Sequence, residues 1–184
     1  MYTQKKKRNG AKGFSLVETL VAITILLIAV LAPMRIVSQS IKAAALAGEQ
    51  LTATFLAQEG IESVARLRDG DVLDEDAVTW GWYSSLLPAC KDATGCSYDV
   101  VNNSFIACSG TSCALKFDEN ATNGAYYYHG SGGTQSRYTR VMSVIQTTTG
   151  EVEVTSTVSW FSDTVQDTVS VQLRTRIFDQ YGGN

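Results

Sequence analysis

Glu18 is the residue whose setting most clearly needs a chemical explanation. It is the only charged residue in the apolar run from Phe14 to Leu31, which is rich in Leu, Val, Ile and Ala. As a helix this run would measure ~27 Å at ~1.5 Å per residue, close to the ~30 Å hydrocarbon thickness of a bilayer. A carboxylate deep in lipid costs ~2.5–3.5 kcal/mol on insertion scales. Glu18 therefore needs either a place near the headgroups or a positive partner.

A second group of residues that could do chemistry is a cluster of four cysteines, Cys90, Cys96, Cys108 and Cys113. An even, clustered count in an exported domain indicates two disulfide bonds. Zinc is the alternative, but the spacings do not reproduce paired C-x2-C knuckles. Three connectivities are possible. Sequential pairing, Cys90–Cys96 and Cys108–Cys113, is favoured because short turns with Gly95 and Gly110 would bring those cysteines together first.

The remaining polar motifs predict no enzyme, no metal site and no cofactor. The single histidine, His129, has no accompanying G-x-S-x-G elbow, and Gly130–Gly133 lacks the lysine of a P-loop. The acids between Asp69 and Asp76 depart from the EF-hand order because Leu73 occupies the third ligand position, so a solvated loop is expected. Packing roles are expected for two aromatic stretches, Trp80–Tyr83 and Tyr126–Tyr128.

Charge is unevenly distributed along the chain. Residues 1–13 contain five of the 15 basic residues and no acid, which leaves 10 basic against 18 acidic residues, a net charge of −8, for the rest. Nucleic-acid binding needs clustered Lys and Arg, so we expect no nucleic-acid binding by the acidic body. A basic segment before an apolar one fits a cytoplasmic flank, with the C-terminal part outside the membrane.

Two ordinary membrane interpretations and one local explanation compete for the N-terminus. A cleaved secretory signal could use Ala45-Leu46-Ala47, but the apolar run is longer than the usual ~7–15 residues and ends well before that site. A plain uncleaved anchor leaves Glu18 unexplained. Ser15-Leu16-Val17-Glu18 spells the capping-box pattern S-x-x-E, which would make Glu18 a helix starter. Capping does not explain the glycine and the basic leader just before it.

The N-terminus resembles the signature of type IV pilins and type II secretion pseudopilins over Lys12-Gly13-Phe14-Ser15-Leu16-Val17-Glu18-Thr19-Leu20-Val21-Ala22. In that family a membrane peptidase removes a short basic leader after the glycine, and the new N-terminal residue is N-methylated. The resemblance implies cleavage between Gly13 and Phe14 by prepilin peptidase, and N-methylation of Phe14. It also implies a role in assembly and register for Glu18, which is fifth when Phe14 is first.

The resemblance also implies a partner for Glu18. Cleavage creates an α-amine at Phe14, and Glu18 is expected to meet such an amine on a neighbouring pilin subunit. An unpaired carboxylate and an unpaired ammonium are each unfavourable in low dielectric, whereas the pair is tolerable. The chain is therefore expected in the cytoplasmic membrane as a single-pass precursor, and in an extracellular pilus or at the cell surface after assembly.

Helical character is predicted to continue to Arg68. Pro33 is expected to bend the helix rather than stop it. Residues 34–68 are rich in helix formers, and an apolar stripe at steps of three and four residues is expected to pack against the chain's own globular domain: Ile41, Ala45, Leu46, Leu56, Ala57, Ile61, Val64 and Leu67. Asp69-Gly70-Asp71 is expected to end the helix. The segment Ala57–Asp69 weakly resembles a pattern in minor pilins and the I/V type of pseudopilin.

Beyond Tyr98 the hydrophobic period changes to two. Short strands are predicted at Ser104–Ala107 and Ala114–Phe117, and longer ones at Tyr138–Gln146, Val152–Trp160 and Val165–Ile177. These longer strands should form an antiparallel meander whose apolar face the long helix covers, an α+β fold that matches the pilin fold implied by the N-terminus. The resemblance is imperfect, because major pilins often close a C-terminal loop with a disulfide and no cysteine follows Cys113 here.

The predicted organisation is a leader at 1–13, a transmembrane and assembly helix at 14–33, an amphipathic continuation at 34–68 and a disulfide-containing β-sheet domain at 69–184. The favoured function is a structural minor pilin-like subunit of a type IV pilus. A minor pseudopilin of a type II secretion system is the alternative within the superfamily. A membrane-anchored adhesin or binding domain that never polymerises is the alternative outside it.

Overall fold

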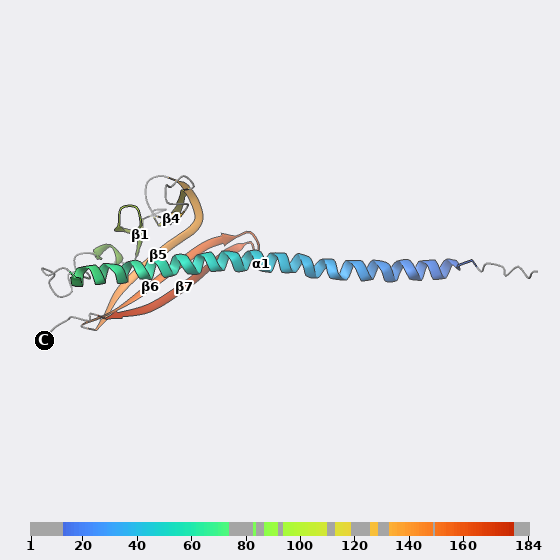
Figure 1. The fold of residues 1–184 in the computed structure, drawn as a ribbon, viewed down its shortest axis with the longest axis horizontal. Helices are drawn as coiled ribbons and strands as arrows, with labels where there is room; N and C mark the ends of the chain where they lie inside the picture. The colour runs from blue at the N-terminus through green and yellow to red at the C-terminus, as the bar shows by residue number, and fades with distance from the viewer. Residues whose placement is uncertain are drawn as a thin grey trace, which may run out of the picture. The chain divides into compact units, whose positions relative to one another are not determined.

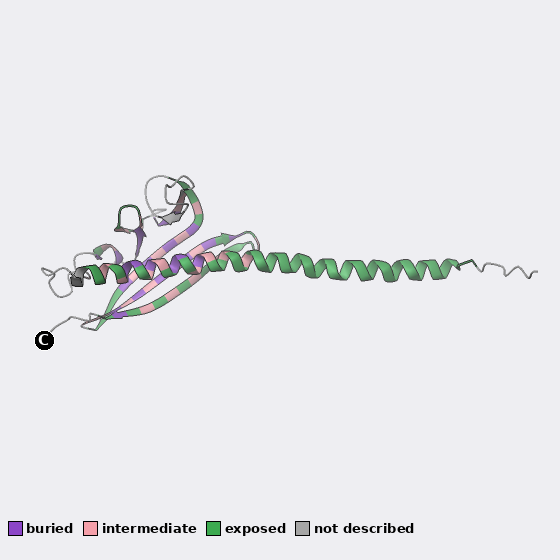
Figure 2. Ribbon diagram, in the orientation of Figure 1, coloured by how far each residue is buried: buried purple, intermediate pink, exposed green. Residues whose placement is uncertain are grey.

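The computed structural model describes residues 13–73, 83, 87–91, 94–109, 113–118, 126–128, 133–148 and 150–178. The chain divides into two compact units, Met1–Ala44 and Ala45–Asn184. The first unit contributes the N-terminal part of helix α1 (Leu16–Leu73), and every described residue in it is exposed (Figures 1 and 2). The helix continues through Pro33, so this proline does not end it.

The second unit contains the rest of α1, a short 3-10 helix η2 (Pro88–Cys90) and one sheet of seven strands among the described residues. The strands are β1 (Cys96–Asp99), β2 (Ser104–Ala107), β3 (Ala114–Asp118), β4 (Tyr126–Tyr128), β5 (Thr134–Thr148), β6 (Glu151–Ser162) and β7 (Asp167–Phe178). Every pairing is antiparallel. The predicted α+β class, a long helix on an antiparallel sheet, is confirmed.

Strand β5 organises the sheet. Along one edge it pairs with β6, which pairs in turn with β7 over its whole length (Figure 1). Along the other edge, its first half pairs with β3 from Thr134 to Thr139, and its second half pairs with β1 at Met142. Two small hairpins, β1–β2 and β3–β4, are thus attached to the same side of one long strand.

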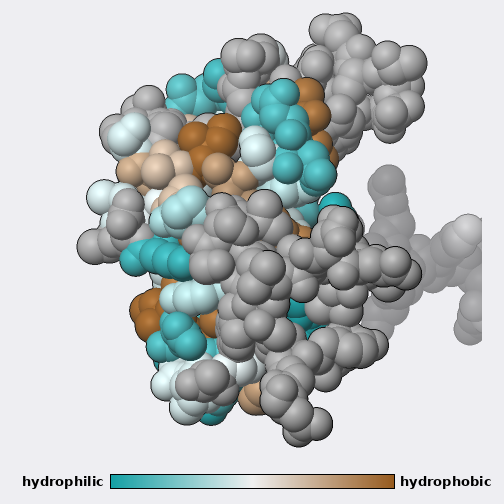
Figure 3. Space-filling model, turned by 90° about the vertical axis from the view of Figure 1, so that its left-hand side faces the viewer, coloured by the Kyte–Doolittle hydropathy of each residue, from teal (hydrophilic) through white to brown (hydrophobic). Residues whose placement is uncertain are grey.

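The C-terminal half of α1 packs on this sheet in two hydrophobic clusters. Ala53, Leu56 and Ala57 lie against Tyr138, Val158 and Trp160, whereas Val64 lies against the ends of the long strands and the cysteine region. Burial alternates along β6 as the period of two requires (Figure 2). Among the described residues visible in Figure 3, hydrophobic side chains lie in small groups between hydrophilic ones.

The predicted helix stripe is confirmed only in its C-terminal part. Leu56, Ala57 and Val64 are buried, and Ile61 and Leu67 pack against the core, but Ile41 is 65% exposed. The predicted helix end was wrong, because α1 runs through Asp69 and Gly70 to Leu73. Arg68 accounts for part of this difference: its side chain binds the Asp69 carboxylate at 2.6 Å and donates to the carbonyl of Phe178 at 3.3 Å. Such tertiary contacts override weak local helix signals.

Candidate functional site

The start of α1 is held by Ser15. Its hydroxyl accepts a hydrogen bond from the backbone N–H of Glu18 at 3.2 Å, and its carbonyl accepts one from the N–H of Thr19 at 3.2 Å. The first bond is the half of a capping box in which the N-cap hydroxyl satisfies the N3 amide. Ser15 therefore caps the start of the helix through its hydroxyl and carbonyl oxygens, and the cap does not require the Glu18 carboxylate.

Gly13 and Phe14, the residues flanking the predicted cleavage bond, directly precede the helix. Both are exposed, and the Phe14 side chain is 80% exposed. A Cβ atom added to Gly13 would meet nothing within 4 Å. The peptide bond between them is therefore open to an approaching protein.

Glu18 lies one helical turn beyond Phe14 and is exposed. No ion pair joins it to another residue of the described ranges. Glu18 thus presents a carboxylate on an apolar helix surface, where a cation from outside the described chain can reach it.

The rest of this helix surface is suited to an apolar environment. The hydroxyls of Thr19 and Thr24 each donate to a carbonyl one turn back, that of Leu16 and that of Val21, at 2.8 Å. Side-chain donors satisfied in this way add little cost in lipid, where every polar group needs an internal partner. By length and composition α1 is apolar enough to cross a membrane.

Comparison with protein families identifies the kind of N-terminus that these residues form. Residues 8–32 match the family model of the prokaryotic N-terminal methylation motif. The chain begins with a prepilin-type methylation motif. The matched stretch contains Gly13, Phe14 and Glu18, and it is consistent with a type IV pilin-like protein. Neither a search of curated proteins nor a search of solved structures gave a significant match.

The prepilin motif indicates the role of the N-terminal helix. It supports a type IV pilin or pseudopilin, a structural subunit rather than an enzyme. It implies processing by prepilin peptidase and assembly with other pilins, and it fits membrane anchoring before that assembly. The match covers residues 8–32 and does not extend to the sheet domain.

In the sheet domain, an ion pair between the buried Arg140 and the partly exposed Glu59 fixes α1 on the strands. Arg140 on β5 is fully buried and donates to the Glu59 carboxylate at 2.8 Å, to the carbonyl of Leu56 at 3.1 Å and to the carbonyl of Tyr98 at 2.9 Å. Burial lowers the pKa of the Arg140 guanidinium, and the Glu59 carboxylate opposes that shift. An arginine stays charged under such conditions, so the pair links helix, β5 and β1 through one cation.

Gly60 sets the distance between helix and sheet beside this pair. A Cβ atom at Gly60 would lie 2.7 Å from the sulfur of Met142, 2.8 Å from the hydroxyl of Ser156 and 3.3 Å from Cδ of Arg140. All three neighbours are buried. The helix can therefore approach β5 and β6 this closely only because residue 60 has no side chain.

A second polar cluster, the Glu49 cluster, consists of Glu49, Arg137 and Trp160. The Glu49 carboxylate accepts from Arg137 at 2.8 Å and from the indole N–H of Trp160 at 3.0 Å. The pKa of the Glu49 carboxyl lies below its ordinary value because of the Ser162 hydroxyl, the Trp160 N–H and the Arg137 cation, and burial opposes this shift. Because Arg137 and Trp160 bind the Glu49 carboxylate of α1 from the sheet, the cluster positions the helix.

Disulfide bonds join the four cysteines in sequence. Cys90 pairs with Cys96, whose Cα atoms are 4.6 Å apart, and Cys108 pairs with Cys113, at 5.3 Å. The two bridges are neighbours, because the N–H of Cys108 donates to the carbonyl of Gly95 at 2.9 Å. The described residues contain no free cysteine and no group of His, Cys, Asp and Glu arranged for a metal.

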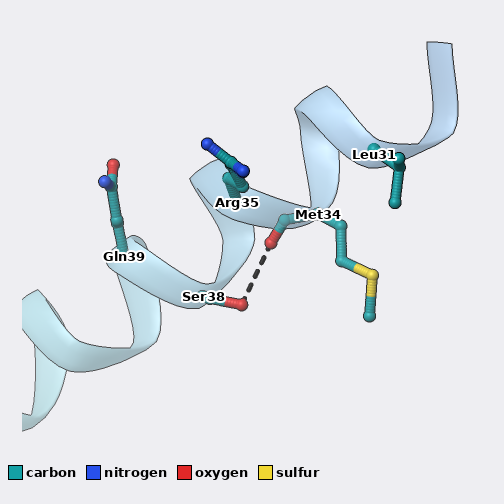
Figure 4. Close-up of a pocket in the computed structure, with 5 residues that line it drawn as sticks. All are labelled: Leu31, Met34, Arg35, Ser38 and Gln39. Carbon is teal, nitrogen blue, oxygen red and sulfur yellow. Dashed lines mark hydrogen bonds between the residues drawn. The ribbon is translucent and has the colours of Figure 1, made fainter. Parts of the chain in front are cut away.

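One surface hollow lies along α1 in the first unit. Figure 4 shows it lined by Leu31, Met34, Arg35, Ser38 and Gln39, all from this one helix. The Ser38 hydroxyl donates to the carbonyl of Met34 at 3.0 Å, so it is already satisfied. A wall made by a single helix encloses no ligand, and Arg35 is the only ionisable group in it. The hollow therefore supports no enzymatic site.

Several residues singled out in the sequence lie outside the described residues. They are the leader before Gly13, Asp74–Asp76, Trp80–Trp82, Gly110, His129 and Gly130–Gly132, as well as the side chains of Tyr126–Tyr128. Conversely, the structure adds Glu49, Arg137 and Arg140, which sequence reasoning missed. Arg140 had a usable signal: it shares the inward parity of Tyr138, Met142 and Val144 on β5, and a charge at such a position needs a partner.

Proposed function

We propose that this chain is a minor pilin-like structural subunit of a type IV pilus. In this proposal residues 14–33 anchor the precursor in the cytoplasmic membrane with the C-terminal part outside. Prepilin peptidase removes residues 1–13, Phe14 is N-methylated, and the mature chain enters the filament through its N-terminal helix. The match of residues 8–32 to the methylation motif carries the proposal.

The chemistry of maturation explains why assembly follows cleavage. Hydrolysis of the Gly13–Phe14 bond leaves a carboxylate on Gly13 and an amine on Phe14, in the same layer of the membrane as Glu18. An isolated charge in low dielectric is strongly unfavourable, whereas a carboxylate and an ammonium that meet are tolerated. A precursor that still has its leader lacks this amine, so it cannot satisfy the Glu18 of a neighbour. Pairing between subunits would then fix the axial register of the helices.

A minor subunit is favoured over the abundant one by the segment Ala57–Asp69, which resembles a pattern in minor pilins and pseudopilins. In this chain the segment includes Glu59 and Gly60, which hold the helix on the sheet. A pseudopilin of a type II secretion system shares the methylation motif and is separated by location. A pilus subunit is recovered in filaments sheared from cells, whereas a secretion subunit stays with the cell envelope.

The first experiment is mass spectrometry of the N-terminus of the mature chain from membranes and from sheared filaments. N-methyl-Phe14 in both fractions is the expected result. A retained Met1 would favour a plain anchor, and a chain that begins at Gly48 would favour a secretory signal.

The second experiment separates the charge of Glu18 from its place in the helix start. Glu18→Leu is expected to leave the amount of protein in the membrane unchanged and to reduce its amount in filaments. Ser15→Ala is the matched control, because it removes the hydroxyl that caps the Glu18 amide and keeps the carboxylate. Equal loss in both variants would attribute the effect to the helix start and contradict the pairing mechanism.

A further inference from the structure

Arg35 is the first charged residue of α1 after Glu18. Every residue between them, from Thr19 to Met34, is uncharged and exposed. Arg35 is exposed as well, and no ion pair joins it to another residue in the described part of the chain. A guanidinium stays charged in proteins and carries five N–H donors. Arg35 therefore presents an unpaired cation at the end of a long apolar surface.

The neighbouring sequence contains no acid that could neutralise this cation. Between Glu18 and Glu49 the chain has two charged residues, Arg35 and Lys42, and both are positive. The Glu49 carboxylate is already bound, because it accepts from Arg137 at 2.8 Å and from the indole N–H of Trp160 at 3.0 Å. An anion for Arg35 must therefore come from outside the chain.

The spacing between Phe14 and Arg35 matches the thickness of a bilayer. Arg35 lies 21 residues after Phe14, and α1 continues through Pro33, so the two residues are ~32 Å apart along the helix at ~1.5 Å per residue. The hydrocarbon layer measures ~30 Å, and each headgroup layer adds only ~5–8 Å. With Phe14 at the cytoplasmic boundary, Arg35 lies in the outer headgroup layer, and Lys42, ~10 Å further on, lies beyond it.

The surface hollow at Arg35 has the same order of chemistry as a phospholipid. On the membrane side of Arg35, the side chains of Leu31 and Met34 are 57% and 66% exposed. Gln39 follows one turn beyond, and Figure 4 shows Arg35 and Gln39 projecting to the same side of the helix. Apolar side chains, a cation and an amide thus follow one another as acyl chain, phosphate and polar headgroup do. The hollow is open, and neighbouring lipids can supply its remaining walls.

We propose that the hollow at Arg35 binds the phosphate of a phospholipid in the outer leaflet, and that this contact sets the depth of α1 in the membrane. The inference rests on the proposed function, which supplies the orientation of the helix. The Arg35 guanidinium donates to the phosphate oxygens, a pairing for which its fork geometry is suited, and Leu31 and Met34 lie against the acyl chain. Because a helix is a spacer of fixed length, Arg35 then holds the Gly13–Phe14 bond at the cytoplasmic surface, where the leader is removed.

The first test measures the contact by solid-state NMR on the full-length chain in vesicles of equal parts phosphatidylethanolamine and phosphatidylglycerol. Arginine is labelled with carbon-13 at Cζ, and its dephasing by the lipid phosphorus is recorded. Wild type is expected to show a component with a Cζ–phosphorus distance of about 5 Å, as direct guanidinium–phosphate hydrogen bonds require. Arg35→Lys, which removes the label at this position, should lose part of that component. The matched control Arg66→Lys, the same exchange elsewhere on α1, should retain all of it. Unchanged dephasing in Arg35→Lys would overturn the inference.

The second test measures the rate of leader removal by prepilin peptidase reconstituted in the same vesicles. Arg35→Leu extends the uncharged stretch to Ile41 and lets the helix slide, so the rate is expected to fall at least about fivefold. Arg35→Lys should restore the rate to within about twofold of wild type, because a lysine also binds phosphate. Lys42→Leu is the matched control and should stay within about twofold, since Arg35 remains in place.

The outcomes separate this inference from the proposed function. A wild-type rate for Arg35→Leu would refute the role of Arg35 in setting the depth. A wild-type chain that is not cut between Gly13 and Phe14 would instead reject the proposed function, and the NMR contact would still decide the lipid site. If Arg35→Leu fails to enter the vesicles, the NMR comparison of wild type with Arg35→Lys decides.

Discussion

Replacing glycine by alanine should raise the free energy of unfolding at Gly48 and lower it at Gly60, although both residues lie on helix α1. Alanine in place of glycine stabilises a helix interior by ~0.5–1 kcal/mol. At Gly48 the added methyl group meets nothing within 4 Å, so the free energy of unfolding should rise by about this amount. At Gly60 the same methyl group would lie 2.7 Å from the Met142 sulfur and 2.8 Å from the Ser156 hydroxyl.

The size of the stability change for Gly60→Ala depends on two opposing effects. Overpacking a dense core costs ~1–3 kcal/mol, and the helix gain offsets up to ~1 kcal/mol of it. Met142 is flexible but fully buried, as is Ser156, so neither can move away without displacing further core atoms. We therefore expect Gly60→Ala to lower the free energy of unfolding by about 1 kcal/mol. For a domain of this size, that corresponds to a fall in Tm of ~2–4 °C.

The assay is thermal unfolding of the full-length chain in detergent, followed by tryptophan fluorescence. Trp160 is 2% exposed and lies in the core against α1, so its emission reports on helix–sheet packing once Trp80 and Trp82 are replaced by phenylalanine in the parent chain and in both variants. Gly48→Ala is the matched control for helix propensity. A rise in Tm for Gly60→Ala equal to that for Gly48→Ala would refute the close-approach explanation of Gly60.

Three further predictions concern the polar contacts and the bridges. Glu59→Gln should lower the free energy of unfolding by ~1–2 kcal/mol in the same assay, since it leaves the buried Arg140 cation without its counter-charge. Solvent moderates the loss, because the Glu59 side chain is 36% exposed. The control Glu62→Gln, at an exposed position, should change the free energy of unfolding by less than ~0.5 kcal/mol. The pKa of Glu49 is lower in the folded chain than its ordinary value, so its stabilising contribution is complete above that ordinary value and is lost as the pH falls through the folded pKa. The Tm of Glu49→Gln should therefore fall less on acidification than the Tm of wild type. Parallel curves of Tm against pH for the two proteins would contradict this. Peptide mapping under non-reducing conditions should recover Cys90 with Cys96 and Cys108 with Cys113, and reduction should lower the free energy of unfolding by ~2 kcal/mol per bridge; a peptide that joins Cys96 to Cys108 would contradict the sequential pairing.

The features that sequence reasoning predicted are those encoded by local pattern. The apolar run after Gly13 predicts a helix because it is long and apolar enough to cross a bilayer in that form, and the alternation from Val152 to Trp160 predicts β6 because one face of the strand is buried. The offset between Phe14 and Glu18 points to the methylation motif in the same way. All of these signals lie within a few tens of residues.

The features that were missed depend on partners far apart in sequence. Arg140 is 81 residues from Glu59, and Glu49 is 88 residues from Arg137 and 111 residues from Trp160. Each looks like a solvated charge until the sheet brings its partner close. The same reason explains the helix end, where the contact of Arg68 with the Phe178 carbonyl is invisible to helix propensity. The attachment of β1 and β3 to a single strand likewise follows from three-dimensional pairing alone.

The locality of both cystine links has a consequence for biogenesis. Each link spans only five or six positions, and all four sulfurs precede the residues of β5, β6 and β7. If the segment that follows the membrane helix is exported in N-to-C order, as the proposed function implies, both bridges can form before β5, β6 and β7 have emerged. The bridges then need no rearrangement after the rest of the domain has emerged. Strands β1 and β3 of the oxidised segment are in place to pair with β5.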